Sequence, residues 1–318
     1  MRLELNKRAV GILRRVLRDP AAYGVSVTEY GGGVTVVDAG VKALGGLRVG
    51  LEVVKVCMGG LGDAYLTSTD VGGYAFPLIN VVTDHPAVAS LAAQAAYPVE
   101  GVDLIVSGPG RALLRAPRDV YDYLGLEGED VGEAVFVIQS GSLPSRDVVG
   151  RLKEVVGRDV HLYLVVTPLR SVAGVTQVAG RVVESVIVRL RLLGYDVRRV
   201  IYAYGTCPVP PVGEGGRAPL PDDMINYLGV AHLWVRDGGE ELPRVLKDVV
   251  VTSTPTYGEC FYDLLEAAGW DFRRVKGFPN TFSIARVVVN DLASGEVFDV
   301  GRLHLGVVRR CYPRYVKL

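Results

Sequence analysis

The hydrophobic positions of this chain follow two periods, one typical of helices and one typical of strands. Between residues 10 and 17, apolar side chains recur every three or four positions with charges between them, which predicts an amphipathic helix. Two apolar or β-branched runs, over residues 34–38 and 51–56, predict strands next to Gly-rich turns. After Pro86, a series of small and apolar residues as far as residue 96 predicts a further helix.

The middle of the chain alternates between the two periods. Its predicted strands cover residues 134–138, 161–166 and 199–204, and its predicted helices cover residues 145–156 and 174–193. The connections are too long for hairpins, so this β-α-β-α-β order favours a sheet covered by helices. Towards the C-terminus, a helix over residues 257–268 precedes a hairpin of residues 284–290 and 297–308. A segment rich in Pro and Gly, residues 207–216, predicts a long loop.

These elements indicate the α/β fold class, with mixed α+β character. A chain of 318 residues buries most of the surface of its unfolded form and usually divides into two domains or subdomains. We place an N-terminal α/β subdomain at residues 1–130 and a C-terminal α/β subdomain, which carries the long helix, at residues 131–318. In this division the C-terminal hairpin could also complete the N-terminal subdomain.

Composition narrows the classes of function. Lys and Arg together number 35, as do Asp and Glu, so no net charge attracts nucleic acid or a membrane surface. No segment approaches the ~20 apolar residues that span a bilayer, and the N-terminus lacks the apolar core of a signal peptide. We therefore expect a cytoplasmic protein. The few Gln residues are in keeping with a heat-loving source.

The cysteines and histidines do not form a metal-binding motif. Cys57, Cys207, Cys260 and Cys311 are far apart and no two form a C-x-x-C pair, and the four histidines form no H-x-x-x-H motif. We therefore expect neither a metal site nor a disulfide framework.

Gly-rich turns raise the question of phosphate binding. The chain lacks a G-x-x-x-x-G-K-[ST] motif, and Gly60-x-Gly62 is followed by Tyr65 where a Rossmann motif requires Gly. This pattern disfavours a nucleotide cofactor. The turn Ser107-Gly108-Pro109-Gly110-Arg111 combines backbone N–H groups with a guanidinium and could hold an anion such as phosphate. A tight turn with a solvated Arg explains the same residues equally well.

Arg181 and Glu184 are a second candidate for chemistry. They stand three positions apart in the predicted helix 174–193 and therefore share one of its faces. The ordinary interpretation is an exposed helical ion pair, which contributes about 0.3–0.5 kcal/mol to stability. However, this helix is apolar on most sides, so a charged pair within it requires a polar cleft or a buried partner.

Short strings of residues, taken in order along the chain, carry a more specific signal. They are Val56-Cys57-Met58-Gly59-Gly60-Leu61, Thr83-Asp84-His85-Pro86-Ala87, Ser107-Gly108-Pro109 with Arg111-Ala112-Leu113, Gly180-Arg181-Val182-Val183-Glu184, Cys207-Pro208, Asp223 with Tyr227 and Gly229, Tyr257-Gly258 with Phe261-Tyr262, and Val289-Asn290-Asp291-Leu292 with Ser294-Gly295. Each string resembles a signature segment of the archaeal methenyltetrahydromethanopterin cyclohydrolases. Together they keep the family's order from about residue 36 to residue 308, which is nearly the whole chain.

The resemblance implies two α/β subdomains with a substrate cleft between them and a homotrimeric assembly. It also implies interconversion of the cyclic N5,N10-methenyl-tetrahydromethanopterin cation and N5-formyl-tetrahydromethanopterin, with Glu184 as general base and acid and Arg181 orienting it. Because this reaction oxidises nothing, we expect no nicotinamide, flavin or metal cofactor. The resemblance places the pterin substrate against Gly59, Gly60, Asp84, His85, Ser107, Gly108, Pro109, Arg111, Gln177, Pro208, Asp223 and Tyr227.

Three positions depart from the family pattern. Ala95 follows Gln94 where relatives commonly have Lys, Leu169-Arg170 stands where they tend to have Thr-Ala, and Gly110 replaces their usual Ala. These changes leave the reaction intact but leave open a different pterin or a folate as the substrate. A non-catalytic pterin-binding protein is the remaining alternative, and the presence of both members of the catalytic pair speaks against it.

Overall fold

The computed structural model describes residues 3–213 and 217–314, and the chain divides into two compact units. Unit 1 comprises Met1–Asp63 and Ala87–Gln177, and unit 2 comprises Ala64–Pro86 and Val178–Leu318. This division differs from the single boundary between residues 130 and 131 that the sequence predicts. It differs because an early hairpin joins a sheet whose other strands come from the C-terminal half of the chain.

Unit 1 is built on a four-stranded sheet in the order β1-β2-β8-β7. Its strands are β1 (Ser26–Glu29), β2 (Val34–Asp38), β7 (Glu133–Gln139) and β8 (His161–Thr167). The three strands β2, β8 and β7 run parallel, and β1 is antiparallel to β2. These parallel strands are nearly continuous apolar runs, as is typical of strands that are covered on both faces. The strands predicted over residues 34–38, 134–138 and 161–166 are thereby confirmed.

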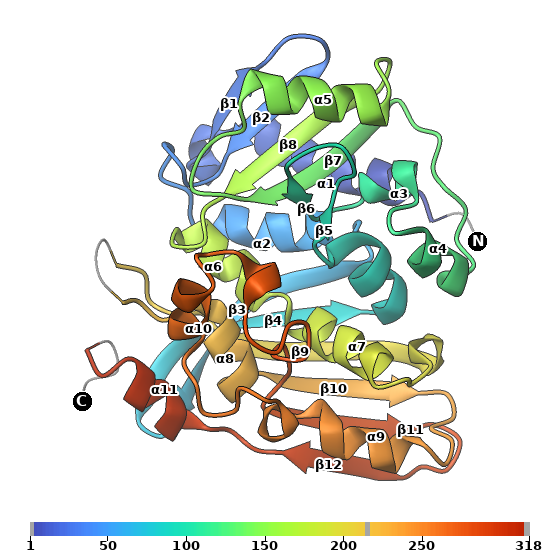
Figure 1. Cartoon of the computed structure of the whole chain (residues 1–318), viewed down its shortest axis with the longest axis vertical. Helices are drawn as coiled ribbons and strands as arrows, with labels where there is room; N and C mark the ends of the chain where they lie inside the picture. The colour runs from blue at the N-terminus through green and yellow to red at the C-terminus, as the bar shows by residue number, and fades with distance from the viewer. Residues whose placement is uncertain (1–2, 214–216, 315–318) are drawn as a thin grey trace. The chain divides into compact units, whose positions relative to one another are not determined.

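Helices cover both faces of this sheet (Figure 1). Helices α1 and α2 share an apolar cluster with Val37, Val135 and Val165, whereas α5 packs with Phe136 and Leu164. The two sets of strand residues alternate because successive side chains point to opposite faces. The other elements of unit 1 are α1 (Leu5–Arg18), η1 (Ala21–Tyr23), α2 (Leu47–Cys57), the π-helix η2 (Val88–Gln94), β5 (Tyr97–Pro98), β6 (Ile105–Val106), α3 (Arg111–Leu114), α4 (Arg118–Leu124), α5 (Arg146–Val156) and α6 (Val172–Ala179).

The segment 51–56 is helical, which corrects the strand predicted there. It lies within α2, and the buried residues Val49, Val53 and Val56 of this helix recur at helical spacing on one of its faces. The β-branched residues that suggest a strand in the sequence supply the buried face of the helix instead, because packing overrides their weak intrinsic preference.

Unit 2 contains a six-stranded sheet in the order β12-β11-β10-β9-β4-β3. Strand β9 runs antiparallel to both β4 and β10, β10 and β11 are parallel, and β11 and β12 form the predicted C-terminal hairpin. The strands are β3 (Gly62–Val71), β4 (Tyr74–Thr83), β9 (Val200–Pro208), β10 (Val230–Val235), β11 (Arg286–Asp291) and β12 (Val297–Gly301). The helices are α7 (Val182–Leu192), η3 (Val197–Arg199), α8 (Pro221–Leu228), α9 (Leu242–Val249), η4 (Val251–Ser253), α10 (Phe261–Ala267), η5 (Phe272–Arg274) and α11 (Leu305–Cys311).

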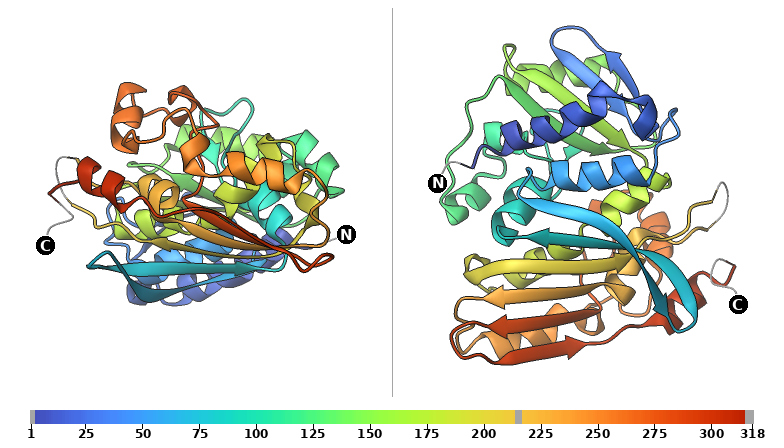
Figure 2. Two further views of the ribbon diagram at one scale, coloured as in Figure 1. Left: turned by 90° about the horizontal axis from the view of Figure 1, so that it is seen from below. Right: turned by 180° about the vertical axis from the view of Figure 1, so that it is seen from behind.

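Only one face of this sheet is covered by helices of its own unit. Helices α7, α8 and α9 lie on that face (Figure 1), and the view from behind shows β9 to β12 without a helix of the described part of unit 2 in front of them (Figure 2). On β10 and β11, buried residues alternate with partly exposed ones, which is the pattern of a sheet covered on one face.

The long helix predicted over residues 174–193 is in fact two helices. α6 ends at Ala179 and α7 begins at Val182, with Gly180 and Arg181 between them. The predicted β-α-β-α-β run also divides at this break, because β7 and β8 belong to the sheet of unit 1 and β9 belongs to that of unit 2. Apolar periodicity continues through the break, so the sequence does not reveal it.

A disulfide joins Cys260 and Cys311, which corrects the expectation that the chain contains none. Cys260 precedes α10 and Cys311 ends α11, and 51 positions separate them in the sequence. Such a pair cannot be recognised from spacing, because only the packing of the two helices brings the sulfur atoms together. Cys57 and Cys207 are buried and lie outside this disulfide.

The remaining predicted segments agree with the structure at element level. The helix after Pro86 forms as the π-helix η2, and the predicted helix 257–268 is represented by α10. Strand β9 extends to Pro208, so the Pro- and Gly-rich loop begins after it, and residues 214–216 of that loop lie outside the described residues. In the described ranges, no helix is both long and apolar enough to cross a membrane.

Candidate functional site

Arg181 and Glu184 form an ion pair at the start of α7. Arg181 Nη1 donates a hydrogen bond to Glu184 Oε2 at 2.7 Å, and their side chains are only 14% and 13% exposed. Glu184 lies in the first turn of α7, where the helix dipole favours a carboxylate. Arg181 is the N-cap residue, which holds its side chain beside that turn. The pair is therefore sheltered, unlike the exposed pair that helix statistics suggest.

The first turn of α7 lies directly against β9. A Cβ added to Gly205 would lie 2.6 Å from Val182 Cγ1 and 2.9 Å from Val183 Cγ2, so only Gly allows this approach. Cys207 lies two residues further along the same face of β9 and is fully buried. The end of β9 is therefore fixed next to the helix that carries the Arg181–Glu184 pair.

Asp222 is the third ionisable group of this region, and the sequence did not single it out. It lies in the first turn of α8, is 7% exposed, and its Oδ2 atom has no hydrogen-bond partner in the described structure. Burial raises the pKa of Asp222 to about 7. A hydrogen bond with its own backbone and the charge of Arg181 lower the pKa, and the charge of Glu184 raises it. Asp222 therefore lies in the electrostatic field of the pair. An acid in the first turn of a helix is too common for sequence to distinguish this one.

The Cys207 thiol belongs to the same group. Burial raises its pKa well above the usual value, and the negative charge of Asp222 adds to this effect. Cys207 is therefore a neutral thiol at physiological pH and not a nucleophile. The region between α7, β9 and α8 thus combines one guanidinium with two carboxyl groups, of which Asp222 has a pKa raised to about 7 by burial.

Asp223 and Tyr227, predicted to bind substrate, have polar atoms that hold other parts of unit 2. Asp223 accepts hydrogen bonds from the Phe261 N–H group at 2.9 Å and from the Tyr312 hydroxyl. The Tyr227 hydroxyl donates to the Glu259 carbonyl at 2.7 Å and accepts from the Gly258 N–H group. Both side chains therefore tie α8 to the segment that leads into α10.

The sheet register separates Pro208 from Asp84 and His85. Leu78 pairs with Pro208 and Thr83 pairs with Ala203, so Asp84 and His85 follow β4 beyond Ala203. Four residues of strand, roughly 13 Å, separate Ala203 from Cys207. Both Asp84 and His85 are exposed. The register of β4 and β9 thus places these two residues away from the end of β9.

In unit 1, Gly59 and Gly60 have a packing role. Both have positive φ angles after the end of α2. A Cβ at Gly60 would lie 2.7 Å from Arg8 Cβ, and one at Gly59 would lie 3.1 Å from Leu5 Cβ, both in α1. These glycines allow α1 and α2 to approach each other.

The turn from Ser107 to Arg111 also packs within unit 1. Ser107 bridges to Val137, and the Pro109 carbonyl accepts from Asn6 Nδ2 at 2.8 Å. A Cβ on Gly110 would lie 2.6 Å from the Phe136 ring, which accounts for Gly at a position where the family usually has Ala. With Gly108 N–H bonded to the Ala93 carbonyl at 2.8 Å, the turn is integrated into the backbone network.

Arg111 is buried rather than solvated, which differs from both interpretations of the sequence. It is 2% exposed, and its guanidinium donates hydrogen bonds to the carbonyls of Leu91, Ala95 and Ala116. It also lies over the Tyr97 ring, 5.5 Å from the ring centre. This geometry supports a structural role and does not favour an anion site at Arg111.

Gln177, near the end of α6, retains unused hydrogen-bonding capacity. It is 1% exposed, and neither Oε1 nor Nε2 has a partner in the described structure. A buried amide without partners is unusual in proteins and is often completed by water or a ligand. This observation supports the prediction that Gln177 binds substrate.

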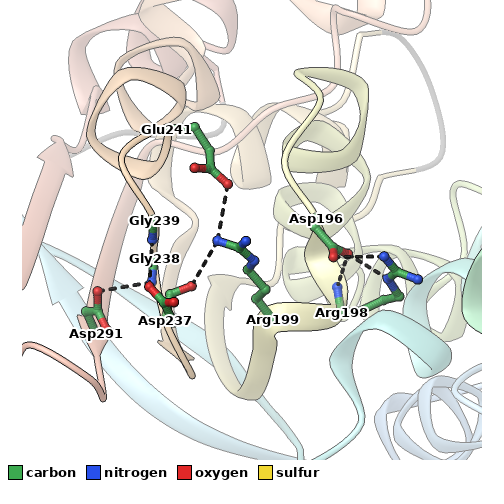
Figure 3. A network of polar contacts seen from close by, with 8 residues as sticks. All are labelled: Asp196, Arg198, Arg199, Asp237, Gly238, Gly239, Glu241 and Asp291. Carbon is green, nitrogen blue, oxygen red and sulfur yellow. Dashed lines mark hydrogen bonds and ion pairs between the residues drawn. The ribbon is translucent and has the colours of Figure 1, made fainter.

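A polar network occupies the opposite end of the unit 2 sheet, where β9 begins and β10 and β11 end (Figure 3). Arg199 contacts Glu241 at 3.3 Å and the Asp237 carbonyl at 3.4 Å, and Asp291 accepts from the Gly238 N–H group. Each charged group there has a protein partner, so the network holds the loops at this end of the sheet in place. Across residues 3–213 and 217–314, no cluster of three or more His, Cys, Asp or Glu side chains could hold a metal ion.

Comparisons with a family model and with known proteins agree with one another. The family model described as Cyclohydrolase (MCH) matches residues 4–312. The chain is similar to the methenyltetrahydromethanopterin cyclohydrolase of Methanocaldococcus jannaschii, with 31% identity over 97% of this chain and 98% of that protein. It is also similar to the enzymes of the same name from Methanocella arvoryzae, with 34% identity over 96% of each chain, and Methanoregula boonei, with 32% identity over 98% of this chain and 99% of that protein.

Proposed function

This chain belongs to the methenyltetrahydromethanopterin cyclohydrolase family, and on that premise we propose that Glu184 and Arg181 catalyse its reaction. The enzyme is a hydrolase that converts the cyclic N5,N10-methenyl-tetrahydromethanopterin cation to N5-formyl-tetrahydromethanopterin. The observation that carries the proposed mechanism is the sheltered contact of 2.7 Å between Arg181 Nη1 and Glu184 Oε2.

The chemistry of the substrate explains why a carboxylate is needed. The methenyl carbon shares a positive charge with two nitrogens, so a neighbouring carboxylate stabilises the cation and accepts a proton from the attacking water. The tetrahedral adduct then collapses as one C–N bond breaks. The protonated Glu184 gives its proton to the departing nitrogen, and the hydroxyl proton of the adduct passes to Glu184 as the formyl C=O bond forms. Release of this proton to solvent restores the carboxylate, so one side chain serves both steps.

Arg181 positions this carboxylate. A guanidinium that donates a hydrogen bond to a carboxylate oxygen fixes the direction of the carboxylate. Arg181 is therefore expected to affect the rate through Glu184.

The reaction needs no redox cofactor, because water adds and a C–N bond breaks without a change in oxidation level. A nicotinamide or flavin would therefore have no role. The electrophile already carries a positive charge, so a metal ion is not needed to polarise it. We expect activity to survive dialysis of the purified protein against a chelator.

The enzyme is expected to work in the cytoplasm as a homotrimer. Tyr65, Val82 and Tyr202 are large exposed apolar residues on strands of the unit 2 sheet, whose far face carries no helix of that unit's described part. Exposed apolar surface of this kind is typical of an interface between subunits. Light scattering coupled to size-exclusion chromatography would give the mass of the assembly.

A different pterin or a folate is the second candidate substrate. Ala95 stands where relatives commonly have Lys, so a cation that could meet the substrate is missing there, and Arg170 is exposed after β8. Loss of methenyl absorbance, measured with the tetrahydromethanopterin and tetrahydrofolate forms, tests the proposal. We expect hydrolysis of the tetrahydromethanopterin form, with a higher kcat/KM than for the folate. Absence of hydrolysis with both would contradict the proposed function.

A further inference from the structure

Gly205 leaves room for the first turn of α7 to lie against β9. A Cβ at this position would lie 2.6 Å from Val182 Cγ1 and 2.9 Å from Val183 Cγ2, so a methyl group there would force the helix or the strand to move. The φ angle of Gly205 lies outside the left-handed region, so its backbone would accept Ala. Contact with the two valines is therefore what excludes a larger residue.

The neighbours of Gly205 in the sheet surround this contact. Gly205 pairs with Val81 of β4 and with Ala231 of β10, and residues directly opposite each other in an antiparallel pair point to the same face. Both neighbours are buried. The valines of α7 thus pack where the side-chain layer of the sheet lacks a Cβ, and any side chain at position 205 would take that place.

Val182 and Val183 point away from the proposed catalytic pair. They occupy the two positions between Arg181 and Glu184, and in a helix of 3.6 residues per turn these two positions lie on the side opposite the pair. The Arg181 carbonyl accepts hydrogen bonds from the N–H group of Ser185 at 2.8 Å and from its hydroxyl at 3.1 Å, so Arg181 moves with the first turn. The contact of the valines with β9 therefore sets the distance of the pair from the sheet.

We infer that Gly205 is a positioning residue for the hydrolysis. By leaving room for the two valines, it holds the Glu184 carboxylate at the distance from the sheet at which this group acts on the substrate. The inference rests on the proposed function of Glu184 and Arg181. It extends that function from the side chains that react to the backbone contact that places them.

The size of the expected displacement indicates a large effect on the rate. Nonbonded carbon atoms are most stable at about 3.5–4.0 Å, so Ala at position 205 would push the first turn of α7 away by about 1 Å. A displacement of this size can cost about a hundredfold in rate, because the reacting groups leave their productive geometry. Contacts that bind the rest of the substrate remain, so KM should change much less than kcat.

Crystal structures of the wild type and of Gly205→Ala test the geometry without any substrate. When the two are superposed on β9 and β10, the backbone from Arg181 to Glu184 should lie about 1 Å further from β9 in the variant. An unmoved first turn would overturn the inference, whether or not the wild-type protein hydrolyses a pterin.

Steady-state kinetics provide the second test. Gly205→Ala should lower kcat by about 10- to 100-fold. The addition of Val182→Ala should raise it again by about fivefold or more, because this change removes the carbon atom nearest the new methyl group. Gly238→Ala is the matched control at the other end of the sheet (Figure 3), where a Cβ would lie 2.5 Å from Leu242 Cδ2. It should lower the melting temperature and leave kcat unchanged.

The outcomes of these kinetics separate positioning from general damage to the fold. Gly205→Ala with more than half of the wild-type kcat would refute the inference. A double variant with a still lower kcat would refute it too, because losses that add indicate damage to the fold. If Gly205→Ala does not fold, Val182→Ile adds a carbon to the helix side of the same contact, and an unchanged kcat there would count equally against the inference. Full activity of Glu184→Gln would instead refute the proposed function and leave the crystallographic test in force.

Discussion

Cys260 and Cys311 are joined by a disulfide across 51 positions of the sequence. The residues that follow them, Phe261 and Tyr312, both donate hydrogen bonds to the Asp223 carboxylate. The disulfide and Asp223 therefore close the same junction, at which α10 and α11 meet α8. Asp222, the neighbour of Asp223, is held in place by this junction.

Removal of the disulfide should destabilise the protein. For a separation of 51 residues, the entropy of the unfolded chain predicts a loss of about 4 kcal/mol in the free energy of unfolding for Cys260→Ser/Cys311→Ser. Thermal unfolding with and without a reductant measures the effect. The double variant is the control, because a reductant should not change its midpoint further. Equal midpoints for oxidised and reduced wild type would show that the bond does not contribute.

Glu184→Gln should lower kcat by at least about a hundredfold while substrate still binds, because the substitution keeps the shape and removes the basic site. Arg181→Ala should also be damaging, but the double variant should be little worse than Glu184→Gln, since the two residues act as a unit. Steady-state loss of methenyl absorbance gives the three rates. The mechanism fails if Glu184→Gln retains more than half of the wild-type kcat.

Arg111→Ala should lower stability and leave KM unchanged in the protein that folds. The substitution leaves three buried carbonyls without their donor, at a cost of about 3 kcal/mol or more. Arg118→Ala, which removes an exposed Arg from the same unit, is the control and should change stability by less than about 1 kcal/mol. A raised KM with unchanged stability would instead support the anion site considered from the sequence.

The stability of the protein should respond to Asp222 in a defined pH range. Its pKa is about 7 in the folded state and near 3.8 in the unfolded chain, so the folded state binds the extra proton between these values. Stability conferred by the protonated carboxyl is therefore lost as the pH rises from about 4 to 7. Relative to Asp222→Asn, the wild type should lose on the order of 2–4 kcal/mol over this range. Urea unfolding of both proteins at pH 5 and pH 8 measures this loss. Equal changes in the free energy of unfolding for the wild type and Asp222→Asn would contradict the prediction.

Gln177→Leu should weaken substrate binding with little effect on the stability of the fold. The Gln177 amide has no partner within the described residues, so its loss should not lower the free energy of unfolding by more than about 1 kcal/mol. If the amide binds substrate, KM should rise by about 10-fold or more, because one hydrogen bond is lost. Thr176→Val, which removes a hydroxyl bonded to the Val172 carbonyl, is the neighbouring control and should leave KM unchanged. An unchanged KM for Gln177→Leu would remove Gln177 from the site.

The sequence by itself determined the elements with strong periodicity and the identity of the candidate pair. The buried runs of β7 and β8, the amphipathic α5 and the C-terminal hairpin follow from local patterns of apolar residues. Arg181 and Glu184 were recognisable because three positions of a helix bring two side chains onto one face, and because the surrounding string resembles a family signature.

Only the tertiary structure decided how these elements combine. The break between α6 and α7, the helical state of residues 51–56 and the disulfide all depend on packing between segments far apart in the sequence. The same holds for single residues. Arg111 is structural because three carbonyls converge on it, and Asp222 stands out because no donor among the described residues meets its Oδ2 atom. Periodicity reports which face of an element is buried, whereas the partners of a buried polar group are set by the distant segments that surround it.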